Sequence, residues 1–293
     1  MIKPMQSLLP LGLAFIMFAI GLGLTLHDFT RVFRAPRAIL VGLINQIVLL
    51  PVIALVVLIG YNGRPEFALG LMILAAAPGG ITSNLLTTLA GGSAALSVSM
   101  TAIASLASVV TVPIILGLAQ THILGLTPDA ATTIQMPFGR IIASILVVTS
   151  LPIVLGMALQ SKRPNWANWA RPKARQLATI IFALIVASAF VGQMDNILTY
   201  FTEIGPRLVM LNVATMTLGV VSALVLGLGR ADSIAIMLEC GLQNAALAIF
   251  IAVSVLGNPI LVVPAITYAL IMNITAAAVI VWSRRAAYPA IAK

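Results

Sequence analysis

Long apolar runs, separated by short segments that carry most of the charged residues, make up this chain from end to end. A window of about 19 residues finds nine such runs, each long enough for the roughly 20 residues that a helix needs to cross the hydrocarbon core. The pattern predicts an all-α integral membrane protein of one domain, residues 1–293, with nine transmembrane spans. The spans are expected near residues 6–26, 38–60, 67–90, 93–119, 138–159, 177–198, 204–228, 233–255 and 259–282.

Composition excludes a soluble globular domain. Of the 293 residues, 61% are hydrophobic and only 8% are charged, with a mean hydropathy of +1.13, whereas soluble domains carry roughly 25% charged residues. The net charge of +9 does not indicate a nucleic-acid partner, because the Lys and Arg residues sit between apolar runs and not on one folded surface. The expected partner is the lipid bilayer. The first run lacks a small-residue cleavage site, so a retained helix is expected and not a signal peptide.

The basic residues are divided unevenly between alternate loops, which predicts the orientation. Twelve of the sixteen fall on one side, and that side is expected to be cytoplasmic, with the N-terminus outside the inner (plasma) membrane and the C-terminus inside. The twelve are Arg31, Arg34, Arg37, Lys162, Arg163, Arg171, Lys173, Arg175, Arg230, Arg284, Arg285 and Lys293.

Two predicted spans are interrupted by polar or helix-breaking residues. Pro78-Gly79-Gly80 breaks the third span, and Glu239 to Asn244 lie in the middle of the eighth. The third and eighth spans differ by five positions, an odd offset, so the two interruptions have opposite orientations across the membrane, which is the signature of an inverted repeat with a binding site at broken helices. The first repeat is expected over about 6–119 and the second over about 138–282.

Glu239 is the one acidic residue, out of seven, that lies deep inside a span. A carboxylate there is costly unless it is paired or lines a wet cavity, so it is a candidate functional group. No Lys or Arg lies deep in a span to neutralise it. Its partner is therefore expected to be a cation or a proton from solution; a protonated Glu that bonds a neighbouring helix is the alternative.

The other polar residues within the spans offer mainly oxygen atoms, which suit a hard monovalent cation. Ser97 and Thr101 are four residues apart and so share one helix face. The half-helix after Gly80 would present free N–H groups to an anion, although a plain kink is the simpler alternative. Cys240 is read as a small buried residue rather than a side-chain ligand. The set comprises Gln46, Thr82, Ser83, Asn84, Ser97, Thr101, Gln243, Asn244 and Asn273.

Four motifs in order resemble the bile acid:sodium symporter family over nearly the whole chain. They are Gly21-Leu-Gly-Leu-Thr-Leu26 before Asp28-Phe29, Pro78-Gly79-Gly80 leading to Ser83-Asn84, Ala95-Leu96-Ser97 before Thr101, and Glu239-x-Gly241-x-Gln243-Asn244. The chain looks like the nine-helix, bacterial form. The resemblance implies a panel of spans 1, 5 and 6 that moves against a core of spans 2, 3, 4, 7, 8 and 9, with spans 3 and 8 crossing at their breaks.

The resemblance also implies two coupling sodium ions and no other cofactor. Residues expected at the first sodium site are Ser83, Asn84, Ser97, Thr101 and Glu239, and those at the second are Gln46, Glu239, Gln243 and the backbone of Cys240 and Leu242. Substrate contacts are expected at Ile81, Thr82, Asn244 and Asn273. Ile81 departs from the Thr that commonly follows Pro-Gly-Gly in bacterial members, so a bile acid is not assumed as the substrate.

These residues bear on three classes of function. Sodium-coupled import of a small organic anion, bile-acid-like or a monocarboxylate, by a secondary symporter with alternating access accounts for the oxygen-rich set, the lone carboxylate and both breaks. A proton-coupled exporter or arsenite-type permease on a related fold stays open because Cys240 adjoins Glu239. An enzyme is not expected, since the spans hold no His and no second carboxylate.

Overall fold

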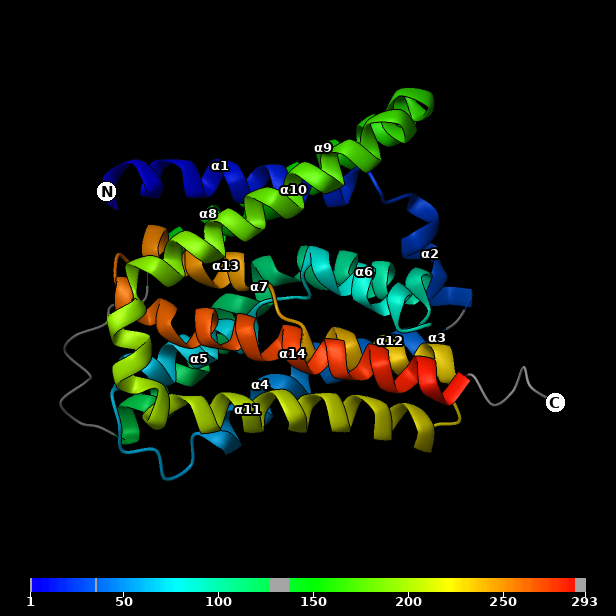
Figure 1. The fold of residues 1–293 in the computed structure, drawn as a ribbon. Coiled ribbons are helices and arrows are strands. Elements are labelled where there is room, and N and C mark those ends of the chain that lie inside the picture. Colours follow the sequence, from blue (N-terminus) through cyan, green and yellow to red (C-terminus); the bar gives the residue numbers. More distant parts are fainter. Residues whose placement is uncertain (1, 35, 127–136, 288–293) are drawn as a thin grey trace.

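Helices account for nearly all of the residues that the computed structural model describes, which are 2–34, 36–126 and 137–287 (Figure 1). No strand occurs among them. The helices are α1 (Ile2–Gly21), α2 (Leu26–Arg34), α3 (Pro36–Ile44), the π-helix η1 (Asn45–Leu49), α4 (Leu50–Val57), α5 (Pro65–Ala76), α6 (Ile81–Leu89), α7 (Ala94–Leu126), α8 (Phe138–Ile145), the π-helix η3 (Leu146–Ser150), α9 (Leu151–Lys162), α10 (Pro164–Gly192), α11 (Met194–Val225), α12 (Arg230–Gly241), α13 (Ala245–Phe250), the π-helix η4 (Ile251–Val255), the 3-10 helix η5 (Pro259–Leu261) and α14 (Val262–Ala287).

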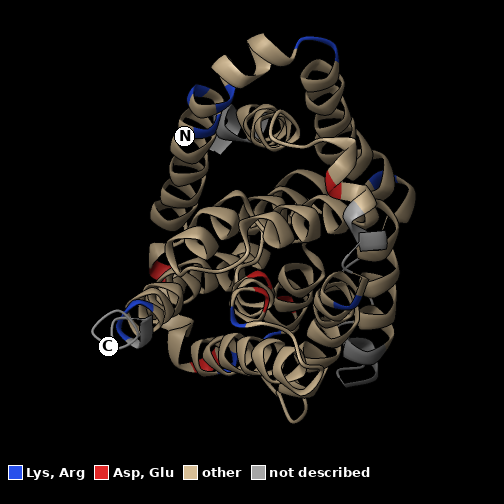
Figure 2. Cartoon of the chain, turned by 90° about the vertical axis from the view of Figure 1, so that its right-hand side faces the viewer, with Lys and Arg blue, Asp and Glu red and all other residues tan. Residues whose placement is uncertain are grey.

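Six helical stretches in the described residues are long and apolar enough to cross a membrane, and they fall on predicted spans 2, 4, 5, 6, 7 and 9. Three shorter apolar helices, Leu8–Gly21, Pro65–Ala76 and Ala245–Val255, fall on predicted spans 1, 3 and 8. Figure 2, in which many helices are seen nearly end-on, shows how few segments of the chain carry a charge. The fold is therefore that of a helical membrane protein.

The sixth predicted span starts too late. The prediction places a loop over about 160–176, but a single residue, Arg163, separates α9 from α10, and α10 begins at Pro164. Proline is favoured in the first helical turn, where its missing N–H is not needed. Helix α10 therefore has 29 residues and a length of about 44 Å, more than the roughly 30 Å of hydrocarbon. Its basic residues Arg171, Lys173 and Arg175 lie within the helix and not in a loop.

Prolines also explain two π-helices. Pro51 and Pro152 each stand two residues beyond the end of a π-helix, η1 and η3 respectively. A proline cannot donate to the carbonyl one turn earlier, and its ring crowds that carbonyl. The preceding turn accommodates this by widening to a π-turn, a feature that is frequent at functional sites. Gln46, a predicted ligand, lies in the wide turn of η1.

The helices form two groups. Helix α1 packs against α9 and α10, which run along the same side of the molecule in Figure 1. Gly21 and Gly156 allow the close approach of α1 and α9, because a Cβ on Gly21 would lie 2.2 Å from the Ile153 carbonyl oxygen. In the second group, α11 packs on α12 and α14, and α5 packs on α7. Helix α13 contacts both groups, so the breaks beside it lie near their boundary.

Candidate functional site

Both predicted interruptions are real breaks, and they pair with each other. Helix α5 ends at Ala76 and α6 begins at Ile81, while α12 ends at Gly241 and α13 begins at Ala245. Gly79 and Gln243 form an isolated antiparallel bridge, and the Asn244 amide donates to the Pro78 carbonyl at 2.9 Å. Non-helical backbone is tolerated at membrane depth only where its polar groups find partners. The two breaks supply partners to each other.

The Glu239 side chain is fully buried at the end of α12 and is surrounded by hydroxyl groups. Its Oε1 atom accepts from Ser83 Oγ at 2.7 Å and also from Ser97 Oγ. Thr101 Oγ1 lies 3.1 Å from each carboxylate oxygen. Among the described residues no Lys or Arg forms an ion pair with Glu239. The carboxylate is therefore held by neutral groups alone.

Oxygen atoms outnumber protons in this cluster. Ser97 Oγ lies 2.8 Å from Asn84 Oδ1 as well as next to Glu239, and Ser83 Oγ lies 2.7 Å from the Gly80 carbonyl oxygen as well as next to Glu239. Each hydroxyl has one proton and faces two acceptors. A bound cation would satisfy the surplus of acceptors. No group of three His, Cys, Asp or Glu residues occurs in the described part of the chain, so the donor set favours a hard monovalent ion over a transition metal.

A second set of polar groups lies beside Gly79. A Cβ on Gly79 would lie 2.2 Å from Glu239 Oε2 and 3.3 Å from Gln46 Nε2, which places both side chains at this glycine. Gln46 is buried, and neither atom of its amide has a partner. Gln243 donates from Nε2 to the Cys240 carbonyl at 2.8 Å, but its Oε1 atom is buried without a partner. Two buried amide side chains with unpartnered oxygens, Gln46 and Gln243, thus belong to the surroundings of Gly79.

The predicted substrate contacts are not all brought together. Ile81 and Thr82 open α6, and Asn244 caps α13 by accepting from the Leu247 amide at 3.0 Å. That cap occupies Asn244 Oδ1, whereas its buried Nδ2 has no partner, so Asn244 offers a donor. Asn273 lies on the exposed face of α14 and donates back to the Ala269 carbonyl at 2.6 Å. No hydrogen bond in the described residues joins Asn273 to the rest of the site.

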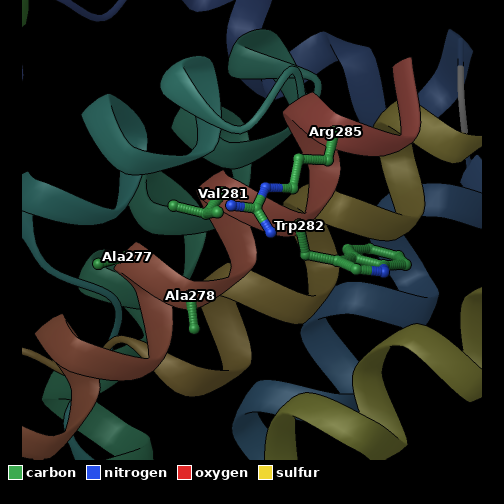
Figure 3. Close-up of a pocket in the computed structure, with 5 residues that line it drawn as sticks. All are labelled: Ala277, Ala278, Val281, Trp282 and Arg285. Carbon is green, nitrogen blue, oxygen red and sulfur yellow. The ribbon is translucent and has the colours of Figure 1, made fainter. Parts of the chain in front are cut away.

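A surface hollow of about 520 Å³ is separate from these residues. Its walls come from the last turns of α14, and Figure 3 shows the Arg285 side chain lying back along the helix toward Val281. No predicted site residue lines it. The lining residues are Ala277, Ala278, Val281, Trp282 and Arg285.

Comparison with protein families gives a direct match. Residues 10–200, more than half of the chain, match the Sodium Bile acid symporter family. The chain belongs to this family. The matched range includes the first break and Ser83, Asn84, Ser97 and Thr101, and it ends before the second break.

Individual relatives in the sodium bile acid symporter family cover the second break as well. The chain is 28% identical over 287 residues to the probable sodium/metabolite cotransporter BASS2 of Oryza sativa, covering 97% of this chain and 65% of that protein. It is 28% identical over 285 residues to the sodium-dependent transporter YocS of Bacillus subtilis, covering 96% and 84%. It is 30% identical over 247 residues to the ileal sodium/bile acid cotransporter of Cricetulus griseus, covering 83% and 68%. The chain thus spans slightly less than two thirds of the rice relative.

Two buried residues at the second break are absent from the sequence prediction. Asn212 from α11 and Tyr268 from α14 both bond the Gly241 carbonyl, the last of α12. An amide inside the seventh predicted span is the signal by which Asn212 can be found, since a polar residue at that depth needs a partner. Tyr268 carries a weaker signal, because a tyrosine is common at membrane boundaries.

Proposed function

We propose that this chain is a sodium-coupled secondary symporter that imports a small organic anion by alternating access. One observation carries the proposal. The buried Glu239 carboxylate, with no cationic side chain paired to it, lies among hydroxyl and amide oxygens that outnumber the available protons, at the point where two broken helices meet. Sites for coupling ions in transporters are built in this way, from half-helices and side-chain oxygens.

The first proposed sodium site is the hydroxyl cluster. Ser83, Ser97 and Thr101 surround Glu239, and Asn84 joins through Ser97. A sodium ion there accepts oxygen lone pairs that the hydroxyl protons leave unused. It also neutralises a carboxylate that is otherwise costly to bury.

The second proposed sodium site lies on the Gly79 side of the same carboxylate. Glu239 Oε2 and the Gln46 amide are already adjacent there, and Gln243 is on the paired backbone of the break. Side-chain oxygens of Gln46 and Gln243 and backbone oxygens of Cys240 and Leu242 complete the proposed set. The Gln46 amide and the Gln243 Oε1 atom are buried without partners, which is costly unless a ligand supplies one.

The proposed substrate is a small organic anion, such as a monocarboxylate. Two sodium ions and the one carboxylate of Glu239 leave a single positive charge at the centre, which one anion balances. The free Nδ2 of Asn244 is a donor, and the first turn of α6 has N–H groups that lack helical partners. Ile81, Thr82 and Asn244 are therefore proposed to face the anion, and Asn273 is retained as a prediction.

The proposed architecture has nine spans in an inverted repeat. The three shorter apolar helices complete spans 1, 3 and 8 beside the six long ones. The group of α1, α8, α9 and α10 would be the panel, and the remaining helices would be the core that carries both breaks. The N-terminus is placed outside the plasma membrane and the C-terminus in the cytoplasm.

The alternative of a proton-coupled exporter or arsenite-type permease depended on Cys240, and the surroundings of this residue do not favour it. The Cys240 side chain is 1% exposed and packs among apolar residues of α3, α7 and α12. In the described part of the chain, the contact of Cys240 with the site is through its backbone carbonyl, which accepts a hydrogen bond from Gln243. A thiol in these surroundings is a packing group and does not point to arsenite.

The test is the melting temperature of the purified protein in sodium chloride against potassium chloride at equal ionic strength. Sodium should raise it, since a ligand present at 100 times its Kd stabilises by about 2.7 kcal/mol. Glu239→Gln should abolish the sodium-specific rise. Glu66→Gln makes the same chemical change at a partly exposed ion pair, 3.6 Å from Arg64, and should keep it. An undiminished rise in Glu239→Gln would contradict the proposal.

A further inference from the structure

Asn212 and Tyr268 bind the same backbone carbonyl from two different helices. Asn212 Nδ2 on α11 and Tyr268 Oη on α14 each lie 2.9 Å from the Gly241 oxygen, and they lie 3.1 Å from each other. Both side chains are fully buried. This triangle stands at the end of α12, two residues after Glu239.

The Gly241 oxygen is the shared acceptor of the triangle. The Asn212 amide donates to it and also lies within hydrogen-bond distance of the Tyr268 oxygen, and the phenol gives its one proton to the Gly241 oxygen. The carbonyl therefore accepts two hydrogen bonds. Gly241 also packs closely against Met216 of α11, since an added Cβ would lie 2.4 Å from Met216 Cγ. The last residue of α12 is thus held by contacts from both α11 and α14.

One donor is enough to satisfy a buried carbonyl. Two donors from separate helices do more, since they fix the direction of the carbonyl relative to both helices. The carbonyls on either side belong to Cys240 and Leu242, which are proposed to be backbone ligands of the second sodium ion. A carbonyl is a useful ligand only when its oxygen points to the ion.

We propose that Asn212 and Tyr268 are positioning residues of the second sodium site, which they serve by fixing the backbone of the second break and not by touching the ion. The inference rests on the proposed function, because it requires that sodium binds at this break. A positioning role differs from a purely structural role in one measurable respect. Loss of a positioning residue changes the affinity for sodium, whereas loss of a structural residue changes only the stability of the protein.

The test compares three variants by sodium titration of the melting temperature, with potassium chloride holding the ionic strength constant. Tyr268→Phe removes one oxygen and keeps the ring, and Asn212→Leu keeps the volume. Thr275→Val is the control, since it removes a hydroxyl on the same helix that bonds only to the Ile271 and Met272 carbonyls. Each of the first two should raise the sodium concentration for the half-maximal shift by about tenfold or more, as outer partners of metal ligands do.

A variant that combines Asn212→Leu with Tyr268→Phe removes both donors to the Gly241 carbonyl. With one donor removed the carbonyl keeps the other, but with both removed it is buried without a partner. The double variant should therefore weaken sodium binding by more than the product of the two single effects, while Thr275→Val should match the wild type.

Two outcomes would contradict these expectations. If both single variants lower the melting temperature without sodium and leave the half-maximal sodium concentration unchanged, the residues are structural and the inference is wrong. If Asn212→Leu cannot be purified in a folded form, Tyr268→Phe decides alone. A wild-type protein with no sodium-specific shift would instead refute the proposed function.

Discussion

Gly79 and Gly80 are neighbours in the sequence but have different surroundings. A Cβ on Gly79 would lie 2.2 Å from Glu239 Oε2, whereas the nearest atom to a Cβ on Gly80 is the Gln243 carbonyl oxygen at 3.5 Å. Gly80 is also extended, at φ −102° and ψ 174°, a conformation open to any residue. A side chain would therefore collide with the Glu239 carboxylate at position 79 but not at position 80.

Gly79→Ala should therefore weaken sodium binding, while Gly80→Ala should leave it nearly unchanged. The added methyl group at position 79 displaces the Glu239 carboxylate from its hydroxyl partners. We expect the half-maximal sodium concentration to rise by about tenfold or more, with little change in the melting temperature without sodium, because the displaced atom ends a side chain and is not backbone. Sodium titration of both variants checks this, and equal responses would contradict it.

Helix α4 ends at a cation contributed by a distant helix. Arg207 on α11 donates to the carbonyls of Val57, Ile59 and Gly60, and its guanidinium carbon lies 5.0 Å from the centre of the Tyr61 ring. Burial and the nearby Glu203 carboxylate raise the pKa of Tyr61. The phenol therefore keeps its proton and donates to Glu203 at 2.5 Å. These contacts fix the end of α4 and the connection to the first broken helix.

Arg207→Leu should lower stability without altering the response to sodium. A cation at a partly buried helix C-terminus contributes up to about 2 kcal/mol, so we expect a lower melting temperature with and without sodium and an unchanged sodium titration. Arg175→Leu on α10 removes the same charge at a side chain for which the structure gives no hydrogen bond or ion pair, and it should have a small effect. Equal melting temperatures for the two variants would show that the cap contributes little.

The position of the helices could largely be read from the sequence, whereas contacts between them could not. Apolar runs identified the six long spans, and Pro78 to Gly80 marked a break by local chemistry alone. The start of α10 was missed because its first turns carry Trp and basic residues, which lower the local hydropathy. At the site, Glu239 is predictable because it is an acidic residue deep inside an apolar span. The roles of Asn212 and Tyr268 depend on α11 and α14 meeting α12, which no local pattern encodes.

At the scale of the whole molecule, charge balance decides the response to membrane potential. Two sodium ions and one monoanion would carry one net positive charge inward, and this is worth about 2.3 kcal/mol per 100 mV. We expect uptake of a monocarboxylate into proteoliposomes to be faster at an inside-negative potential and sigmoidal in sodium concentration. Organic cations should not be taken up. Uptake that ignores an imposed potential, or that rises hyperbolically with sodium, would contradict this stoichiometry.

The hydroxyl groups around Glu239 come from the other half of the chain. Ser83 is 156 residues away from Glu239, and Ser97 and Thr101 also belong to the first half. A sodium ion held there would be a reversible cross-link between the two halves, closing a chain loop much as a disulfide does in a secreted protein. Unlike a disulfide, it would open wherever sodium is scarce. The gradient that drives transport would then also set how tightly the two halves are joined, so that release of the ion on the low-sodium side loosens the structure at the moment the substrate has to leave.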